Sequence, residues 1–209
     1  VYAGDTDRDD DNGGRKRNVL VSGLNMDLGM NYLTQEGNIG VTDIDPLLET
    51  RAINSSHFAL HMVTLRLNLI DHKVHLGTAL TLENNRYAIR KDVIVVPDQD
   101  EFTIVETMDD YKKSKLISTY IQVPLLLHFQ TGDQMENSKF HVSVGGYGGL
   151  LIGSSTKRKG DEIGKIKQRD DFNLNPIRYG VTGRIGFGNL SFYCNYTVSD
   201  LFEEGQGPS

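Results

Sequence analysis

The sequence predicts an all-β fold, an antiparallel up-and-down transmembrane β-barrel. Apolar and polar residues alternate through seven separate segments, so each segment makes a strand with one apolar face and one polar face. The loops that join these segments alternate between long and short, which places the long loops on one rim and the tight turns on the other. Bacterial outer-membrane barrels have this asymmetry.

Composition limits the alternatives. The chain has 209 residues and 38% hydrophobic residues, an average that transmembrane strands also reach because half of their side chains are polar. No run of about 18 apolar residues is present, which excludes a transmembrane helix. Cys194 is the only cysteine, so no internal disulfide forms. The net charge of −6 argues against nucleic acid as a partner, and acids follow the short basic stretch 157–159, which predicts a solvated loop there.

Residues 1–17 are charged and glycine-rich and are predicted to be a flexible acidic leader; the barrel domain is expected over 18–209. The aspartates of this leader have a spacing similar to that of a calcium-binding loop. However, Asp10 stands where that loop needs glycine, and Lys16 stands where it needs the closing carboxylate. A solvated acidic tail is therefore favoured over an ion site.

The first three strands are predicted over 19–32, 59–70 and 74–83. In the first, Leu20 and Leu24 are placed together on the apolar face. A long loop over 33–57 separates the first two strands, and a tight turn at Asp71-His72 separates the second from the third.

The longest excursion, 84–114, contains two β-prone pieces, 93–96 and 102–107, separated by a turn that begins at Pro97. This pattern predicts a hairpin standing apart from the main sheet.

Four strands are predicted in the second half of the chain, over 117–130, 140–152, 177–187 and 190–198. A long polar loop over 154–175 is expected between the second and third of these, and the other two connections are short. Seven strands are visible where eight are expected, so the closing strand is predicted to be missing from the chain shown.

Aromatic residues agree with a membrane setting. Phe129, Phe140 and Phe187 fall on apolar faces at the tight-turn end, and Tyr32 and Tyr179 fall near the long-loop end. Two aromatic girdles flanking an apolar band are typical of a barrel at the two membrane interfaces.

The polar faces supply a predicted network in the barrel lumen, because charges enclosed there must pair. Its members are Asp27, Arg66, Glu83, Gln122, Arg178 and Arg184. An eight-stranded barrel is only wide enough to be filled by side chains, which predicts a plugged interior. Inward glycines are expected to make room for the arginines; these are Gly77, Gly145, Gly149, Gly180 and Gly186. The opposite arrangement, with the leucine stripes packed inward, remains open and would make a soluble lipocalin-like carrier of an apolar ligand.

Three segments, 119–127, 145–153 and 171–180, resemble the PorT-like family of small outer-membrane β-barrels, and the run 196–208 resembles the approach to that family's last strand. The resemblance covers about residues 18–209. It implies an eight-stranded barrel in the outer membrane of a diderm bacterium, with no catalytic residues and no cofactor.

An enzyme that modifies lipids is the other alternative. His141 and Ser143 share a strand face, but that face is the inner one, and no G-x-S-x-G motif is present. The histidines lack metal-ligand spacing. A non-enzymatic barrel is therefore expected in the outer membrane, with its long loops external and its N-terminus periplasmic, bound to other envelope proteins. The candidate contact surfaces are the rim loops and the bare outward glycines Gly146, Gly148 and Gly183.

Overall fold

The computed structural model describes residues 18–32, 55–70, 73–89, 93–97, 102–106, 111–131, 140–160, 164–168, 172–188 and 190–203. These residues form strands and no helix. The strands are β1 (Val19–Ser22), β2 (Asn25–Gly29), β3 (Ser56–Ile70), β4 (Val74–Ile89), β5 (Val93–Pro97), β6 (Phe102–Glu106), β7 (Tyr111–Gln130), β8 (Phe140–Gly160), β9 (Gly164–Gln168), β10 (Ile177–Phe187) and β11 (Leu190–Thr197).

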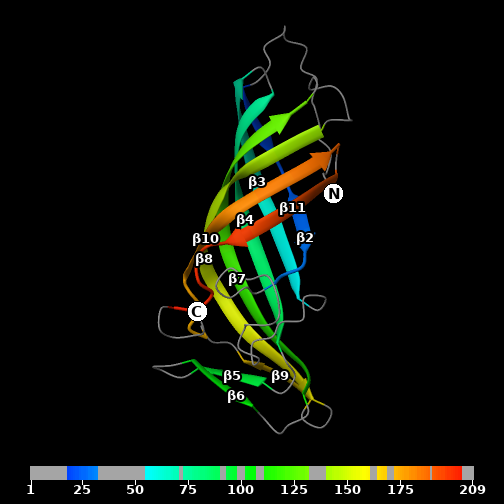
Figure 1. Cartoon of the computed structure of the whole chain (residues 1–209). Helices are drawn as coiled ribbons and strands as arrows, with labels where there is room; N and C mark the ends of the chain where they lie inside the picture. The colour runs from blue at the N-terminus through cyan, green and yellow to red at the C-terminus, as the bar shows by residue number, and fades with distance from the viewer. Residues whose placement is uncertain are drawn as a thin grey trace.

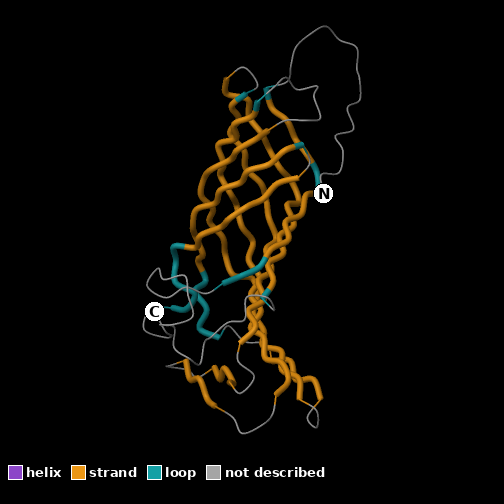
Figure 2. The backbone as a smooth tube through the Cα atoms, turned by 45° about the vertical axis from the view of Figure 1, so that its right-hand side comes forward, coloured by secondary structure: helices purple, strands orange, loops and turns teal. Residues whose placement is uncertain are grey.

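The strands form one curved antiparallel sheet in the order β1-β3-β4-β7-β8-β10-β11, in which β2 also pairs with β3 and β9 with β8. The order of these strands in the sheet is also their order in the sequence, as an up-and-down meander requires. The strands wrap obliquely around a common axis (Figures 1 and 2). The predicted all-β antiparallel fold class is confirmed.

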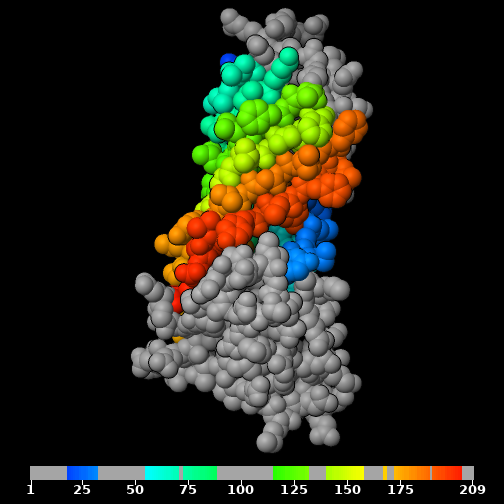
Figure 3. All heavy atoms as spheres, viewed as in Figure 1, coloured from blue at the N-terminus to red at the C-terminus, as the bar shows by residue number. Residues whose placement is uncertain are grey.

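The sheet is not closed by backbone pairing within the described residues, because the path ends at β1 on one side and at β11 on the other. The two edges nevertheless lie side by side, with β11 next to β2 (Figures 1 and 3). Contact between them is made by side chains: the hydroxyl of Tyr193 in β11 occupies the space where a Cβ on Gly29 would stand.

Successive side chains of the strands alternate between an outer apolar face and an inner polar face, as the sequence predicts. The outer face carries large exposed apolar residues, among them Leu65, Leu67, Leu125, Leu127, Val144 and Ile185. Inner positions of the same strands are buried or half-buried. In β10, for example, Val181 is 53% exposed, whereas its neighbour Thr182 is 5% exposed.

The first predicted strand differs from its prediction. It is interrupted at residues 23–24, and β1 exposes Val19 and Val21, while Leu20, predicted on the apolar face, is half-buried on the other face. A register shift in β3 between His61 and Val63 lies at the same level of the sheet. An extra residue at a β-bulge turns the following side chains to the opposite face, and an alternation pattern read along one strand does not show where that happens.

Two predicted long loops also differ from their predictions, since parts of 84–114 and 154–175 are strand. β4 continues to Ile89, β7 begins at Tyr111, β8 continues to Gly160, and β9 pairs with β8. β7 and β8 therefore project past the rest of the sheet as a twisted ribbon (Figure 2). These ends lack apolar alternation because consecutive residues are buried there on both faces, as at Leu116 and Ile117 in β7. The expected hairpin is present as β5 and β6.

The predicted girdle aromatics are all exposed on the outer face. The register pairs Phe187 with Phe140 and Phe129 with Val142, so the three phenylalanines lie at one level near the tight turns. Tyr179, near the opposite end of β10, is paired with Gly148 in the middle part of β8. The leader 1–17, with its aspartate cluster, lies outside the described residues, as does most of the loop 33–57.

Candidate functional site

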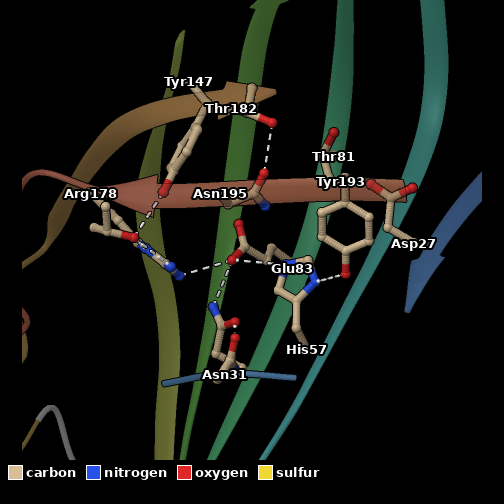
Figure 4. A network of polar contacts seen from close by, with 12 residues as sticks. Asp27, Asn31, His57, Thr81, Glu83, Tyr147, Arg178, Thr182, Tyr193 and Asn195 are labelled. Atoms are coloured by element: carbon tan, nitrogen blue, oxygen red, sulfur yellow. Dashed lines mark hydrogen bonds and ion pairs between the residues drawn. The ribbon is translucent and has the colours of Figure 1, made fainter. Parts of the chain in front are cut away.

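The candidate site is the polar interior of the sheet. Each of the six residues predicted for the lumen network lies on the inner face: Asp27 (β2), Arg66 (β3), Glu83 (β4), Gln122 (β7), Arg178 and Arg184 (β10). They come from strands far apart in the sequence. Figure 4 shows Arg178 and Glu83 pointing toward each other across the interior. The ion pairs that result fall into two groups.

The first group is centred on Asp27. Its Oδ2 accepts a hydrogen bond from Arg184 Nη2 at 2.7 Å, and its Oδ1 lies 3.3 Å from Arg184 Nη1, so the carboxylate is held by both arms of the guanidinium. His61 Nε2 lies 2.9 Å from the same Oδ2, and His61 Nδ1 lies 2.7 Å from the hydroxyl of Thr81. This group ties β2, β3, β4 and β10 together.

The second group is centred on Glu83, whose side chain is 2% exposed. Its Oε1 accepts hydrogen bonds from Arg178 Nη1 at 2.8 Å and from Asn85 Nδ2 at 2.7 Å, and it lies 3.2 Å from His57 Nε2. Asn31 extends the group by donating to Asn85 Oδ1 at 3.0 Å. A buried carboxylate is costly unless it is paired and hydrogen-bonded, and Glu83 is both.

Further polar contacts connect the second group to the far side of the sheet. Arg178 donates to Thr197 Oγ1 from Nη2 at 2.9 Å, and the hydroxyl of Tyr147 lies 2.8 Å from the same atom. The Arg178 guanidinium also lies 5.4 Å from the centroid of the Tyr120 ring, within the range of a cation–π contact. Charge and aromatic surface together fill this level of the interior.

The space left inside is small. A hollow of about 10 Å³ lies between the two groups, and its walls include Asp27, His57, Glu83, Gln122 and Arg184. A cavity needs roughly 10–15 Å³ of such volume to hold one water molecule. At the level of these two groups the interior is therefore filled by its own side chains.

The inward glycines serve a purpose different from the expected one. A Cβ at Gly77 would meet the ring of His128, one at Gly186 would meet the ring of His141, and one at Gly180 would meet the backbone oxygen of Tyr196 and the hydroxyl of Tyr147. These glycines make room for rings and for the close approach of neighbouring strands, and not for the arginines as predicted.

Sequence reasoning missed several members of the network. His57 was expected in a loop, yet it bonds Tyr193 across the two edges at 2.8 Å, from 136 positions away in the chain. Inward parity at 57, 59 and 61 was the available signal, since these residues continue the inner face of β3. Tyr193 and Thr197 likewise follow from the parity of β11, but their partners could not be read from it.

The considered His141–Ser143 pair is not a pair in the structure. Ser143 Oγ lies 2.6 Å from His128 Nδ1, and His141 Nε2 lies 2.8 Å from Ser191 Oγ. Both serines are enclosed on the inner face, away from the outer surface. Among the described residues, no group of three or more His, Cys, Asp or Glu side chains is arranged to hold a metal ion.

The outward glycines lie beside one another. The register pairs Val144 with Gly183 and Val181 with Gly146. A Cβ at Gly148 or Gly183 would meet nothing within 4 Å, and one at Gly146 would lie 3.3 Å from the backbone oxygen of Gly180. Folding of the chain therefore does not require glycine at 148 or 183 for space.

Comparison with known proteins gives one match. A family model for the outer membrane protein beta-barrel domain matches residues 23–203, which is most of the chain. No curated protein and no solved structure matches. In the part of the chain that the structure describes, no helix is long and apolar enough to cross a membrane.

Proposed function

Because the chain belongs to the family of outer-membrane β-barrel domains and is therefore an integral outer-membrane protein, we propose that it is a plugged, non-enzymatic barrel that acts through its surfaces. In this proposal it is a structural or accessory subunit of a larger envelope complex for secretion, transport or assembly. The resemblance of its second half to the PorT-like family supports that assignment. Other envelope proteins and outer-membrane lipid are its partners.

The filled interior is the observation that carries the proposal. A pore needs a continuous aqueous path, whereas here two hydrogen-bonded ion groups and their rings leave about 10 Å³ between them. A carrier of apolar ligands needs an apolar cavity. The inner face instead holds ions, and the apolar side chains are exposed on the outside. Function then rests on the rims and the outer face.

The orientation follows from loop length. In bacterial outer-membrane barrels the short turns are periplasmic and the longer loops are external. The tight turns 71–73 and 188–190 thus lie on the periplasmic side, and the rim with the β7–β8 ribbon lies outside. By the same rule the N-terminus is periplasmic.

The partner-facing surface in this proposal is the bare outer face around Gly146, Gly148 and Gly183. Positions without side chains let another backbone approach closely, and two of these three have open space around them. Exposed apolar residues flank them, including Val144 and Val181. A transmembrane segment of a partner subunit fits a shallow apolar surface of this kind.

Two measurements test the proposal. The purified protein in planar bilayers should give no single-channel conductance, and it should co-purify with other envelope proteins after gentle detergent extraction. Gly148→Leu and Gly183→Leu should reduce that co-purification while leaving the folded fraction unchanged. Gly23→Leu is the matched control, because Gly23 is also exposed with open space around it, but at the junction of β1 and β2.

Steady conductance, or co-purification that is indifferent to both leucine variants, contradicts the proposal. So does an esterase or acyltransferase activity that is lost on Ser143→Ala.

A further inference from the structure

Two histidines lie directly opposite each other inside the sheet, near the tight turns. The register pairs His75 of β4 with His128 of β7, and both side chains are on the inner face. Directly opposite residues of neighbouring antiparallel strands have their Cβ atoms about 4.5–5.5 Å apart. The row that contains this histidine pair crosses five strands, from β3 to β10, and consists of Asn68, His75, His128, Ser143 and Arg184.

Both rings of the histidine pair are held in place. His75 is only 3% exposed, so its ring is enclosed by the interior. His128 Nδ1 lies 2.6 Å from Ser143 Oγ on β8, and the Nε2 side of the same ring occupies the space where a Cβ on Gly77 of β4 would stand. The ring of His128 therefore reaches from one neighbouring strand to the other. Because the rings are held in this way, a repulsion between the two imidazoles acts on the strands that carry them.

The charged groups around His128 are basic. Four of them face it from other strands, namely Arg66 (β3), His75 (β4), His141 (β8) and Arg184 (β10). The described strands of the main sheet contain two carboxylates, Asp27 and Glu83, and each is bound to an arginine. Glu83 lies eight residues from His75 along β4, or about 27 Å. Asp27 contacts Arg184 and His61 and neither member of the histidine pair. No carboxylate of the described strands is therefore placed to neutralise a charge on either imidazole.

The charge of the histidine pair depends on pH. Histidine has an ordinary pKa of about 6.5, so an imidazole changes from neutral to positive within the range that bacteria meet. When both members of the pair are protonated, two positive charges face each other across β4 and β7. Like charges directly opposite each other destabilise an antiparallel pair of strands. The hydroxyl of Ser143, the hydrogen-bond partner of His128, is neutral and does not offset such a charge.

We propose that His75 and His128 form an acid-sensitive latch between β4 and β7. Near pH 7.5 the neutral pair lets the two strands pack, and near pH 5 the charged pair loosens the tight-turn end of the sheet. The ion groups around Asp27 and Glu83 keep the rest of the interior closed, because a protonated histidine beside a carboxylate is attracted to it. In the orientation proposed above, the tight-turn rim faces the periplasm and the latch responds to periplasmic pH. The latch itself requires only the inner placement of the two histidines.

The test compares local hydrogen exchange of the full chain, folded in detergent micelles, at pH 7.5 and at pH 5.0. Mass spectrometry gives the protection of backbone amides relative to unstructured amides at the same pH, which removes the intrinsic effect of pH on exchange. In the wild type, protection over 74–79 and 125–130 should fall by roughly tenfold or more at pH 5.0, since like charges this close repel strongly inside a protein. Protection over 81–85 should change little. His75→Gln/His128→Asn should abolish the fall, because neither new side chain can be charged and the asparagine can keep the contact with Ser143.

His57→Gln/His61→Gln is the matched control. It removes two inner histidines that lie beside Glu83 and Asp27, and it should leave the acid-induced fall at the tight-turn end in place.

Either single substitution, His75→Gln or His128→Asn, should also reduce the fall, and it provides the test if the double variant does not fold. Unchanged protection of the wild type at pH 5.0 overturns the proposal, and so does a fall that persists in these variants. An equal loss of protection over 81–85 identifies general acid unfolding and also overturns it. Single-channel conductance at pH 7.5 contradicts the proposed function and leaves the latch standing, whereas a non-conducting barrel without the acid response contradicts only the latch.

Discussion

At the scale of single residues, Glu83 shows what holds the interior together. Removing its charge with Glu83→Gln leaves the Arg178 guanidinium, now 2.8 Å from Oε1, without its counter-charge in a buried site. Breaking a buried ion pair from one side costs about 3–5 kcal/mol. We expect the midpoint of urea unfolding in micelles to fall accordingly. Glu203→Gln, an exposed carboxylate lost in the same way, should have little effect.

A double variant provides the check on this reading. Glu83→Gln/Arg178→Gln should be less destabilised than the sum of its two single variants, because the remaining groups are then neutral. Strict additivity would mean that the two residues do not form the pair.

Two glycines make a second prediction at this scale. Gly180→Ala should destabilise the barrel by about 1–3 kcal/mol, since its Cβ would meet the backbone oxygen of Tyr196 and the hydroxyl of Tyr147. Gly148→Ala, which enters open space, should be tolerated. The fraction that migrates as folded barrel on unheated gels measures both, and equal tolerance of the two substitutions would be evidence against the inner placement of Gly180.

Parity of alternation was sufficient to place individual residues on the inner face, as it did for Glu83 and Arg178. It could not supply their partners. Arg178 meets Glu83 from 95 positions away in the chain, and His57 meets Tyr193 from 136 positions away. Such contacts depend on the curvature and stagger of the whole sheet, which leave no local mark in the sequence.

At the scale of elements, the apolar stripes predicted the strands well between the two rims and poorly beyond them. The end of β8, with Lys157 and Gly160, looks like a polar loop because its residues are polar or glycine on both faces, although Ser155 and Thr156 are buried. The register shift at Met62 could not be predicted from the sequence either, since a bulge adds one residue without changing the composition of the strand. Backbone pairing decides both features.

The stripe on β7 carries a prediction of its own. Leu125 is exposed in the middle of the apolar run 121–129 of β7, so Leu125→Arg places a charge in the hydrocarbon and should cost about 2–4 kcal/mol. Thr131→Arg, just beyond the end of β7, should cost about 0–1 kcal/mol because it lies at the interface. Folding titrations in lipid vesicles measure both, and a Leu125 variant as stable as the Thr131 variant would argue that this face does not contact lipid.

At the scale of the whole molecule, the sheet has one organising feature: apolar residues lie outside and charges lie inside. In water the exposed leucines and phenylalanines would form a large apolar surface of the kind that soluble proteins avoid. In a membrane the same surface contacts lipid hydrocarbon, and the sheet separates the inner ion groups from that hydrocarbon. The assignment of outside and inside therefore determines the function proposed for the rims and the interior.

Cys194, the only cysteine, tests that assignment without a substitution. It lies exposed on the outer face of β11 between Phe192 and Tyr196. A nitroxide label attached there, on protein reconstituted into lipid vesicles, should be relaxed strongly by oxygen and weakly by a water-soluble nickel chelate. Asn195→Cys in a Cys194→Ser background is the inward control and should be less accessible to oxygen. If the nickel chelate reached the label at Cys194 readily and oxygen reached only the label at position 195, the outer face would not contact lipid. That result would contradict the assignment of outside and inside.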